Sequence, residues 1–422
     1  MVAQSDGRQV SEASRVRTAV PARRLRMRSP QAPLILGGAI AKFGKYVDGS
    51  HWRDRVRSVA AEALRQAGLE PRDIDALVVA SESDAMSLQI NPAPVVAGDV
   101  GLVHASAMRV EGGGASGAMA LRAGLLHVLS GLASRVLVVG FDDAASGLSS
   151  ADTRLLYALS FDTEVDGLTG AGSASLYALS MSCHMRRHGT TEAQMAAVAV
   201  KNRGNARFNP DAHKPMDIDI DAVLRSPVIS TPYKLLDCSL LSDAAAAVVL
   251  CAPDAAPRSE RARVCISGSG CAADPARLGD RPDPGRFAAK TVAAQRAYTM
   301  AGITDPAREI DVAEVYDAFT GAEIQSLEAL GLVAEGKGGA AMTERRFHAE
   351  GEVPVNLSGG LLGQGGSPGA VGIAQAVTIA RLLLGEYHPG AQPSRDLRRG
   401  LVDTHGGVAT LCAVHVLERM DT

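Results

Sequence analysis

Cysteines are the residues of this chain whose chemistry is easiest to judge from type and spacing. Cys183 precedes His184, a pair that could act as nucleophile and base, but adjacent residues on a helix point about 100° apart. Cys251, Cys265 and Cys412 lie in strand-like runs, where buried and inert cysteine is usual. Without any Cys-x-x-Cys spacing, neither a disulfide framework nor a zinc knuckle is indicated, and we predict no metal site.

Glycine-rich turns are the second group. The pairs Gly359-Gly360 and Gly365-Gly366 indicate tight turns. They are no phosphate cradle, because no GxGxxG between a strand and a helix and no Walker lysine accompany them. Two turns, 114–118 and 366–370, each open a long apolar helix, so they stand where a site could be built.

The elements that must position these turns alternate along the chain. Leu34–Ile40 and Ala76–Ala80 are expected to be strands, with an amphipathic helix over Trp52–Ala67 between them. The helix over 114–132 is apolar on all sides, which predicts burial between layers. Strands separated by helices predict an α/β fold with a mostly parallel sheet.

The second half of the chain repeats the first. Residues 59–79 and 292–316 both show a helix ending at Ala-Gly, a turn containing proline, and Ile-Asp leading into a strand. We therefore expect two halves, 33–255 and 262–422, with their glycine-rich turns facing each other across a pseudo-two-fold axis. The segment of about 150–240 is extra in the first half and is expected to form a cap beside the site.

Composition and charge exclude several classes of protein. The 422 residues are 46% hydrophobic and 21% charged with a net charge of −3, which gives no case for nucleic acid or anionic membrane as a partner. The longest apolar run is far below the ~20 residues that span a bilayer, so we expect a cytoplasmic protein. Residues 1–32 carry seven arginines without hydrophobic periodicity, which predicts a disordered basic tail rather than a phosphate-binding arm.

This duplication resembles the thiolase superfamily, in particular its sterol-carrier-protein-x and lipid-transfer branch, over about Leu34 to Glu418. The resemblance implies a duplicated five-layer α-β-α-β-α fold, a cap insertion in the first half, and a homodimer. Five segments carry it in the right order: residues 114–120, the pairs Asn205-Ala206 and Asn209-Pro210, residues 232–243, Glu-Val-Tyr-Asp-Ala-Phe at 314–319, and residues 356–372.

Four positions that do chemistry in thiolases are changed. The Cys-x-Ser-Gly of the family reads Gly-Ala-Ser-Gly here, so the nucleophile position is Gly114 and no acyl-enzyme can form there. The histidine of Gly-His-Pro falls at Ser367. Near the second cysteine the chain has Asp-Thr-His at 403–405, and the asparagine or histidine of relatives is Tyr316.

These replacements imply chemistry without a covalent intermediate. We expect open space beside Gly114, where N–H groups at the helix start could hold an enolate during retro-aldol cleavage of a β-hydroxyacyl thioester. Tyr316 is the leading proton carrier if nearby charges stabilise its phenolate, and its motif resembles a tyrosine-based aldolase branch whose second tyrosine falls near Ser367. His405 could be the base or bond the turn, and Asp317 would orient neighbours or cap the following helix.

The remaining assignments concern substrate and partners. Ser116, Ser367 and Asn356 join Gly114 as substrate contacts, and His213 in the cap would line the acyl channel or face solvent. Coenzyme A thioester is the implied substrate, with no permanently bound cofactor. Three functions stay open: a cysteine-free enzyme of C–C bond chemistry on an acyl-CoA or carrier-bound chain, an acyltransferase or condensing enzyme using a partner's thiol, and a non-catalytic subunit. A small zinc-ribbon and OB-fold protein is the implied partner.

Overall fold

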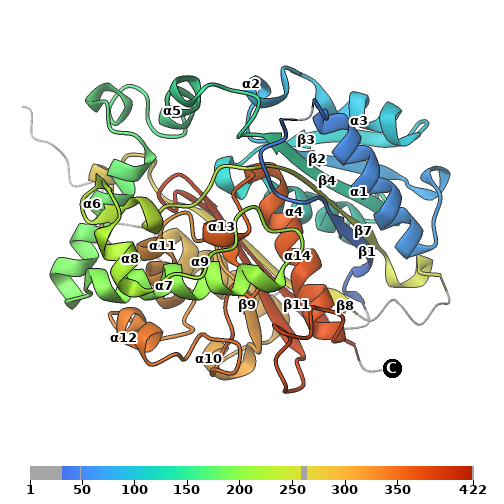
Figure 1. Cartoon of the computed structure of the whole chain (residues 1–422). Helices are drawn as coiled ribbons and strands as arrows, with labels where there is room; N and C mark the ends of the chain where they lie inside the picture. The colour runs from blue at the N-terminus through green and yellow to red at the C-terminus, as the bar shows by residue number, and fades with distance from the viewer. Residues whose placement is uncertain (1–30, 48, 258–263, 421–422) are drawn as a thin grey trace, which may run out of the picture.

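The structure is a computed structural model that describes residues 31–47, 49–257 and 264–420 (Figure 1). Residues 1–30 of the expected basic tail lie outside the described residues. Ala32, at the end of that expected tail, is fully buried and packs in the core.

A nine-stranded sheet runs through the molecule in the order β3-β2-β4-β7-β1-β8-β11-β10-β9. The first half of the chain contributes β1 (Leu34–Ile40), β2 (Ala76–Ala80), β3 (Ser106–Val110), β4 (Arg135–Asp143) and β7 (Asp243–Cys251). The second half contributes β8 (Val264–Ala273), β9 (Val312–Glu314), β10 (Arg399–Gly406) and β11 (Leu411–Arg419).

The expectation of a mostly parallel sheet is wrong. Three neighbouring pairs are parallel, β2–β3, β2–β4 and β9–β10, whereas the other five are antiparallel. Hydrophobic periodicity finds strands but carries no information on their direction. The strands β7 and β11, each inserted next to the parallel group of its half, account for four of the five antiparallel pairs.

The duplication predicted from the sequence is visible in the strand pairing. Each half pairs its first strand with its last, β1 with β7 and β8 with β11, and both pairs are antiparallel. In the first half, β7 also pairs with β4, which pairs in parallel with β2. In the second half, β11 also pairs with β10, which pairs in parallel with β9. A parallel bridge from Ala313 to Val355 takes the place that β3 has beside β2. The halves meet where β1 pairs with β8.

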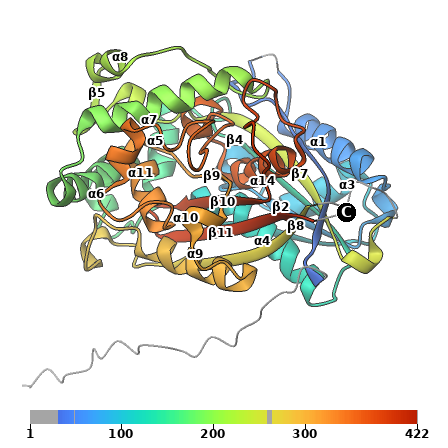
Figure 2. The same ribbon diagram turned by 90° about the horizontal axis from the view of Figure 1, so that it is seen from below.

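Helices complete five layers around these strands. Helices α1 (Trp52–Ala67) and α3 (Pro92–Val100) pack on the outer side of the first half, and α9 (Ala288–Ala301) packs on β8 and β11 (Figure 2). Between the two halves lie α4 (Ser116–Leu129) and α14 (Pro368–Leu384), each of which contacts strands of both halves (Figure 1). The five-layer duplicated fold is therefore confirmed.

Local chemistry explains where these helices start and end. Helix α1 has the predicted bounds, because His51 and Asp54 form a capping box and Gly68 closes it at φ 66°. The buried helix predicted from residue 114 begins with a 3-10 turn, Gly113–Ala115, before α4. Glycine is required where α4 and α14 touch, since a Cβ atom on Gly117 would lie 2.7 Å from the Gly369 carbonyl oxygen.

The segment between β4 and β7 holds α5 to α8 and a small hairpin of β5 and β6, and it packs over the second half. No helix in the described ranges is long and apolar enough to cross a membrane. The shorter helices, the helices of this segment and its two strands are α2 (Asp84–Ser87), α5 (Ser150–Ala158), α6 (Ser173–His188), α7 (Glu192–Asn205), α8 (Ile220–Arg225), β5 (Val228–Ser230), β6 (Tyr233–Lys234), α10 (Pro306–Glu309), α11 (Thr320–Ala329), α12 (Gly338–Thr343) and α13 (Gly360–Gly363).

Candidate active site

Three of the predicted residues come together where the glycine-rich turn before α4 meets the ends of β9 and β10. A Cβ atom on Gly114 would overlap the Tyr316 hydroxyl oxygen and the His405 carbonyl oxygen, and would lie 2.8 Å from Tyr316 Cζ. The Tyr316 and His405 rings are neighbours, with centroids 4.6 Å apart. The expected open space beside Gly114 is therefore wrong, because the phenol of Tyr316 fills it.

Tyr316 differs in a second way from the expectation. Burial raises the pKa of its hydroxyl above the usual value, and the nearby carboxyls of Glu82 and Asp317 raise the pKa further. The expectation that nearby charges stabilise a phenolate is therefore wrong, since those charges are negative. Its backbone N–H donates to Asp403, and no hydrogen bond of its hydroxyl occurs within the described ranges. Tyr316 is thus a neutral phenol whose proton is free to be donated.

His405 is a neutral and fully buried ring with both nitrogens engaged. Lys290 Nζ, which can only donate, lies 2.8 Å from Nδ1, so Nδ1 accepts and Nε2 carries the proton. Nε2 lies 2.8 Å from the Tyr177 hydroxyl, which donates to the Gly407 carbonyl at 2.5 Å. Burial and then Lys290 hold the pKa of His405 well below 6.5. Its contacts join α6 and α9 to the turn that follows β10.

The Lys290 ammonium is the central group of the contacts that anchor His405. It is fully buried and donates to Asp403 Oδ2 at 2.6 Å and to Ser326 Oγ at 2.7 Å. The Tyr316 backbone N–H donates to the same Asp403 oxygen at 3.3 Å. The ion pair therefore connects the ends of β9 and β10, which carry Tyr316 and His405.

Asp317 holds backbone groups rather than facing the turn before α4. Its carboxylate accepts from the N–H groups of Leu361 at 2.6 Å and Leu362 at 3.2 Å, so it caps α13. The helix that follows it directly in the chain, α11, is not the one it caps. Asn202 of α7 donates to it at 2.7 Å, and burial raises its pKa.

Asn356 belongs to the same buried network. It adopts a left-handed backbone at φ 56°, its Oδ1 accepts from the Val315 N–H at 2.7 Å, and its Nδ2 donates to Glu323 at 2.7 Å. It thereby fixes the end of β9 one residue before Tyr316.

The two predicted serines lie at the starts of the central helices with their hydroxyls already occupied. Ser116 Oγ donates to the Gly113 carbonyl at 2.7 Å and accepts from the Gly112 N–H at 3.0 Å, which fixes the turn before α4. Ser367 precedes α14 and makes a long 3.4 Å contact with the Asp142 carbonyl.

His213 lies beside the segment that leads into α14, where its backbone N–H donates to the Gln364 carbonyl at 2.8 Å. Its Nδ1 is 2.8 Å from Ser242 Oγ, and it is half-buried. It is not among the residues that line the cavity described next.

A cavity of about 520 Å³ opens beside the turn before α4. The glycine pairs 112–113 and 406–407 line it together with Leu156 and Leu159 at the end of α5. Glu82, in the segment after β2, also lines it, and sequence reasoning missed this residue. The signal that could have found it is an acid just beyond the carboxyl end of a parallel strand, where sites in α/β sheets form.

The buried cysteines of the described residues do not supply a thiolate in place of the nucleophile. Cys412 lies opposite His405 in the β10–β11 register, but burial raises the pKa of its thiol. Burial also raises the pKa of Cys238 and of Cys265 to about 12. Among the described residues, no group of three histidine, cysteine or acidic side chains could hold a metal ion.

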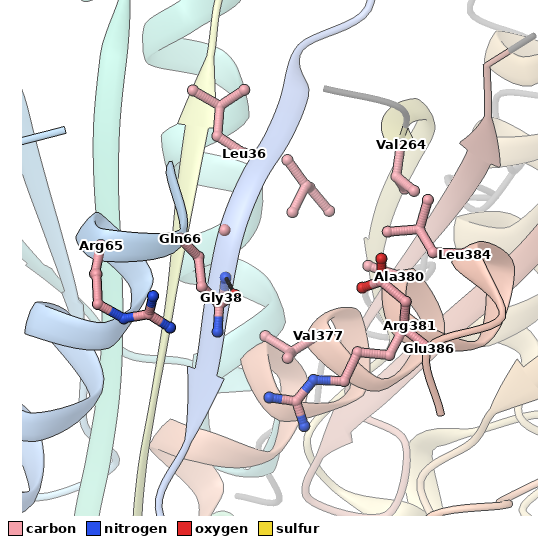
Figure 3. Close-up of a pocket in the computed structure, with 12 residues that line it drawn as sticks. Leu36, Gly38, Arg65, Gln66, Val264, Val377, Ala380, Arg381, Leu384 and Glu386 are labelled. Carbon is pink, nitrogen blue, oxygen red and sulfur yellow. Dashed lines mark hydrogen bonds between the residues drawn. The ribbon is translucent and has the colours of Figure 1, made fainter. Parts of the chain in front are cut away.

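A second cavity, of about 360 Å³, lies at the junction of the two halves between α1, β1 and α14 (Figure 3). Arg65 and Arg381 line it from α1 and α14 (Figure 3). Arg65 is paired with Glu62 at 2.6 Å, and Arg381 lies 3.9 Å from Asp211. Glu386, which is exposed, also lines this cavity.

Known protein families match the two halves of the chain separately. The thiolase N-terminal domain matches residues 35–254, and the thiolase C-terminal domain-like family matches residues 270–419. An acetyl-CoA acetyltransferase of Methanothermobacter thermautotrophicus is 36% identical over 91% of this chain and 99% of its own. A 17-hydroxy-3-oxo-4-pregnene-20-carboxyl-CoA lyase of Mycobacterium tuberculosis is 27% identical over 84% of this chain and 92% of its own.

Two further relatives place the branch. Sterol carrier protein 2 of Oryctolagus cuniculus is 30% identical over 54% of this chain and 42% of its own. The solved structure of an Ltp2-ChsH2(DUF35) aldolase shares the fold at a TM-score of 0.77 and 24% identity, over 93% of this chain and 99% of the other. The chain thus belongs to the thiolase superfamily, in its sterol-carrier-protein-x-like branch, and is an enzyme of the thiolase type.

Proposed function

We propose that this chain cleaves the Cα–Cβ bond of a β-hydroxyacyl thioester, carried by coenzyme A or by a carrier protein, in a retro-aldol reaction without a covalent intermediate. One observation carries the proposal. The Tyr316 hydroxyl occupies the space in which a side chain at position 114 would begin, so a phenol stands where the family has a thiol. A phenol in that place moves protons and does not form a thioester.

The reaction needs two proton transfers and a site for negative charge. A base takes the proton of the β-hydroxyl, the carbonyl forms at Cβ, and the electrons of the Cα–Cβ bond move into the thioester as an enolate. The N–H of Gly114, which has no acceptor among the described residues, lies at the start of the buried α4 and can donate to the enolate oxygen. Tyr316 then protonates Cα, which gives an aldehyde or ketone and a shortened thioester.

The lyase relative supports this reaction, and the acetyltransferase relatives favour a second candidate. In that alternative, this chain transfers an acyl group with a thiol supplied by a partner. Within this chain Gly114 offers no nucleophile, and the thiol opposite His405 has a raised pKa. The physical chemistry of the site therefore favours the cleavage reaction over acyl transfer.

We further propose a homodimer joined at β3 and a small zinc-ribbon and OB-fold partner. Strand β3 is the last strand of its half of the sheet, and residues 106–108 at its free edge are exposed. An unpaired edge strand is a template for pairing with a second copy. The second component named with the aldolase neighbour supports a partner protein at this fold.

The test uses the purified chain, with and without a partner encoded beside it. It compares a β-hydroxyacyl-CoA with the matching β-ketoacyl-CoA. Release of aldehyde or ketone from the hydroxyacyl substrate, lost by at least ~100-fold in Tyr316→Phe, supports the proposal. Acyl transfer from the ketoacyl substrate supports the second candidate, and inactivity with both supports a non-catalytic subunit.

A further inference from the structure

Glu82 is a half-buried acidic residue that lines the cavity and lies close to the glycine-rich turn. It follows β2, and its backbone N–H donates to Asp142 Oδ1 at 3.0 Å, which fixes its place beside the end of β4. Its Oε1 lies 3.8 Å from the position of a Cβ atom on Gly113. The carboxyl therefore faces the turn at which the thioester would be held.

The Glu82 side chain makes no ion pair among the described residues. Its Oε2 and the Tyr157 hydroxyl of α5 are both buried without a partner at full hydrogen-bond geometry, and the Tyr157 hydroxyl is the one group close enough to lower the pKa of Glu82 as a hydrogen-bond donor. A buried polar oxygen without a partner is rare, because it loses the hydrogen bonds of water without replacement. By contrast, Glu111 at the same cavity accepts from the Gly113 N–H at 2.5 Å. A carboxyl that faces the turn and has, in the described part of the chain, only the Tyr157 hydroxyl as a polar side-chain neighbour able to donate to it fits a group that acquires a further partner when substrate binds.

The surroundings of Glu82 set its protonation. Burial is the main cause that raises the pKa of its carboxyl to about 8, and the Asp142 carboxyl adds to the effect. Two further groups act on it: the Tyr157 hydroxyl from α5 lowers the pKa, and Glu111 raises it. The Glu82 carboxyl in turn raises the pKa of Tyr316. At pH 7 about one Glu82 in ten is therefore ionised.

We propose that Glu82 is a catalytic residue, the base that takes the β-hydroxyl proton and later returns it to Tyr316. This assignment rests on the retro-aldol function proposed above. The Glu82 carboxylate takes the hydroxyl proton as the Cα–Cβ bond breaks. Tyr316 gives its own proton to Cα, and the protonated Glu82 then reprotonates the phenolate, so that no proton is gained or lost over the cycle.

Two other candidates for the base fit less well. Both ring nitrogens of His405 are engaged, one by Lys290 and one by Tyr177, so the ring cannot take a proton without breaking that anchor. Tyr316 has a pKa raised by burial and by carboxyls, so its phenolate is too scarce to start the reaction. Of the two glutamates that line the cavity in the described part of the chain, Glu111 already accepts from the Gly113 N–H, which leaves Glu82 as the base.

The experiment measures ketone release from a β-hydroxyacyl-CoA as a function of pH in the wild type, Glu82→Gln, Glu82→Asp and the control Asp84→Asn. Asp84 is an acid two residues further on that pairs with Arg109 instead of lining the cavity. We expect wild-type kcat/KM to rise with pH through about 8. Glu82→Gln should lower kcat by ~100-fold or more and abolish that rise, with KM nearly unchanged. Glu82→Asp should recover part of kcat, and the control should match the wild type.

Each outcome decides one question. An active wild type with Glu82→Gln within about threefold of it and an unchanged pH profile overturns the role of Glu82 and leaves the proposed function standing. An inactive wild type contradicts the proposed function itself. If Glu82→Gln were poorly folded, Glu82→Asp would decide: a folded variant with full kcat and the wild-type pH profile contradicts the assignment, whereas reduced kcat with a shifted profile supports it.

Discussion

Restoring a side chain at position 114 is expected to destabilise the protein rather than restore thiolase chemistry. In Gly114→Ala the new Cβ atom overlaps the Tyr316 hydroxyl and the His405 carbonyl, and it lies 2.8 Å from Tyr316 Cζ, where ordinary Cβ contacts are 3.4 Å or more. Both neighbours are buried and one is backbone, so neither can swing away. Overpacking of this kind costs ~1–3 kcal/mol. Gly114→Cys should cost at least as much.

Chemical denaturation of a double-mutant cycle measures this cost. We expect the penalty of Gly114→Ala to be smaller by ~0.5–1 kcal/mol in a Tyr316→Ala background, because the phenol is then gone. The contact with the His405 carbonyl remains, so the penalty should not vanish. Gly98→Ala on α3 is the matched control, since no atom lies within 4 Å of its Cβ position. The reasoning is refuted if Gly114→Cys is as stable as the wild type and becomes acylated by acyl-CoA.

Three further predictions address the scaffold. Gly117→Ala should destabilise the protein by at least ~2 kcal/mol, because the Cβ atom at position 117 would press on the α14 backbone. The control Gly98→Ala should be neutral or stabilising, and equal urea midpoints for the two variants would contradict the prediction. Lys290→Met should cost ~3–5 kcal/mol by leaving the Asp403 carboxylate buried and unpaired, and should lower activity; a wild-type midpoint would contradict it. Burial raises the pKa of the Glu314 carboxyl to about 7. The stability that this carboxyl contributes is therefore present below pH ~4 and is lost as the pH rises to about 7. Glu314→Gln should make the fall in the free energy of unfolding between pH 5 and pH 7 less steep, by up to ~1.4 kcal/mol per pH unit.

The local sequence pattern predicted several elements of the fold correctly. The strand Leu34–Ile40 and the helix Trp52–Ala67 have the bounds that periodicity and capping residues indicated. The repeat of residues 59–79 at 292–316 matches the equivalent pairing of β2 and β9 in the two halves. Strand direction could not be predicted in this way. The strands β7 and β11 run antiparallel to the strands on either side of them, and the connections that turn the chain round carry no local sequence signal.

The site was harder to predict because it depends on contacts between distant segments. The motif placed Tyr316 at the right strand end, but only the packed structure shows that its ring reaches Gly114. Asp317 was expected to orient its neighbours or to cap the following helix. It caps α13 instead of that helix, and α13 starts 43 residues away in the chain, at Gly360. Glu82 belongs to no motif, and its burial beside the cavity results from the loop after β2 meeting α5.

The most direct measurement follows the acyl group during turnover. The wild type is mixed with a β-hydroxyacyl-CoA whose acyl part is labelled, quenched during the first turnovers, denatured, and examined by intact-protein mass spectrometry while released ketone is quantified. Ketone formation with no mass added to the protein is the expected result. A labelled acyl group that stays on the denatured chain and appears before the ketone would contradict the claim that C–C cleavage here proceeds without a covalent intermediate.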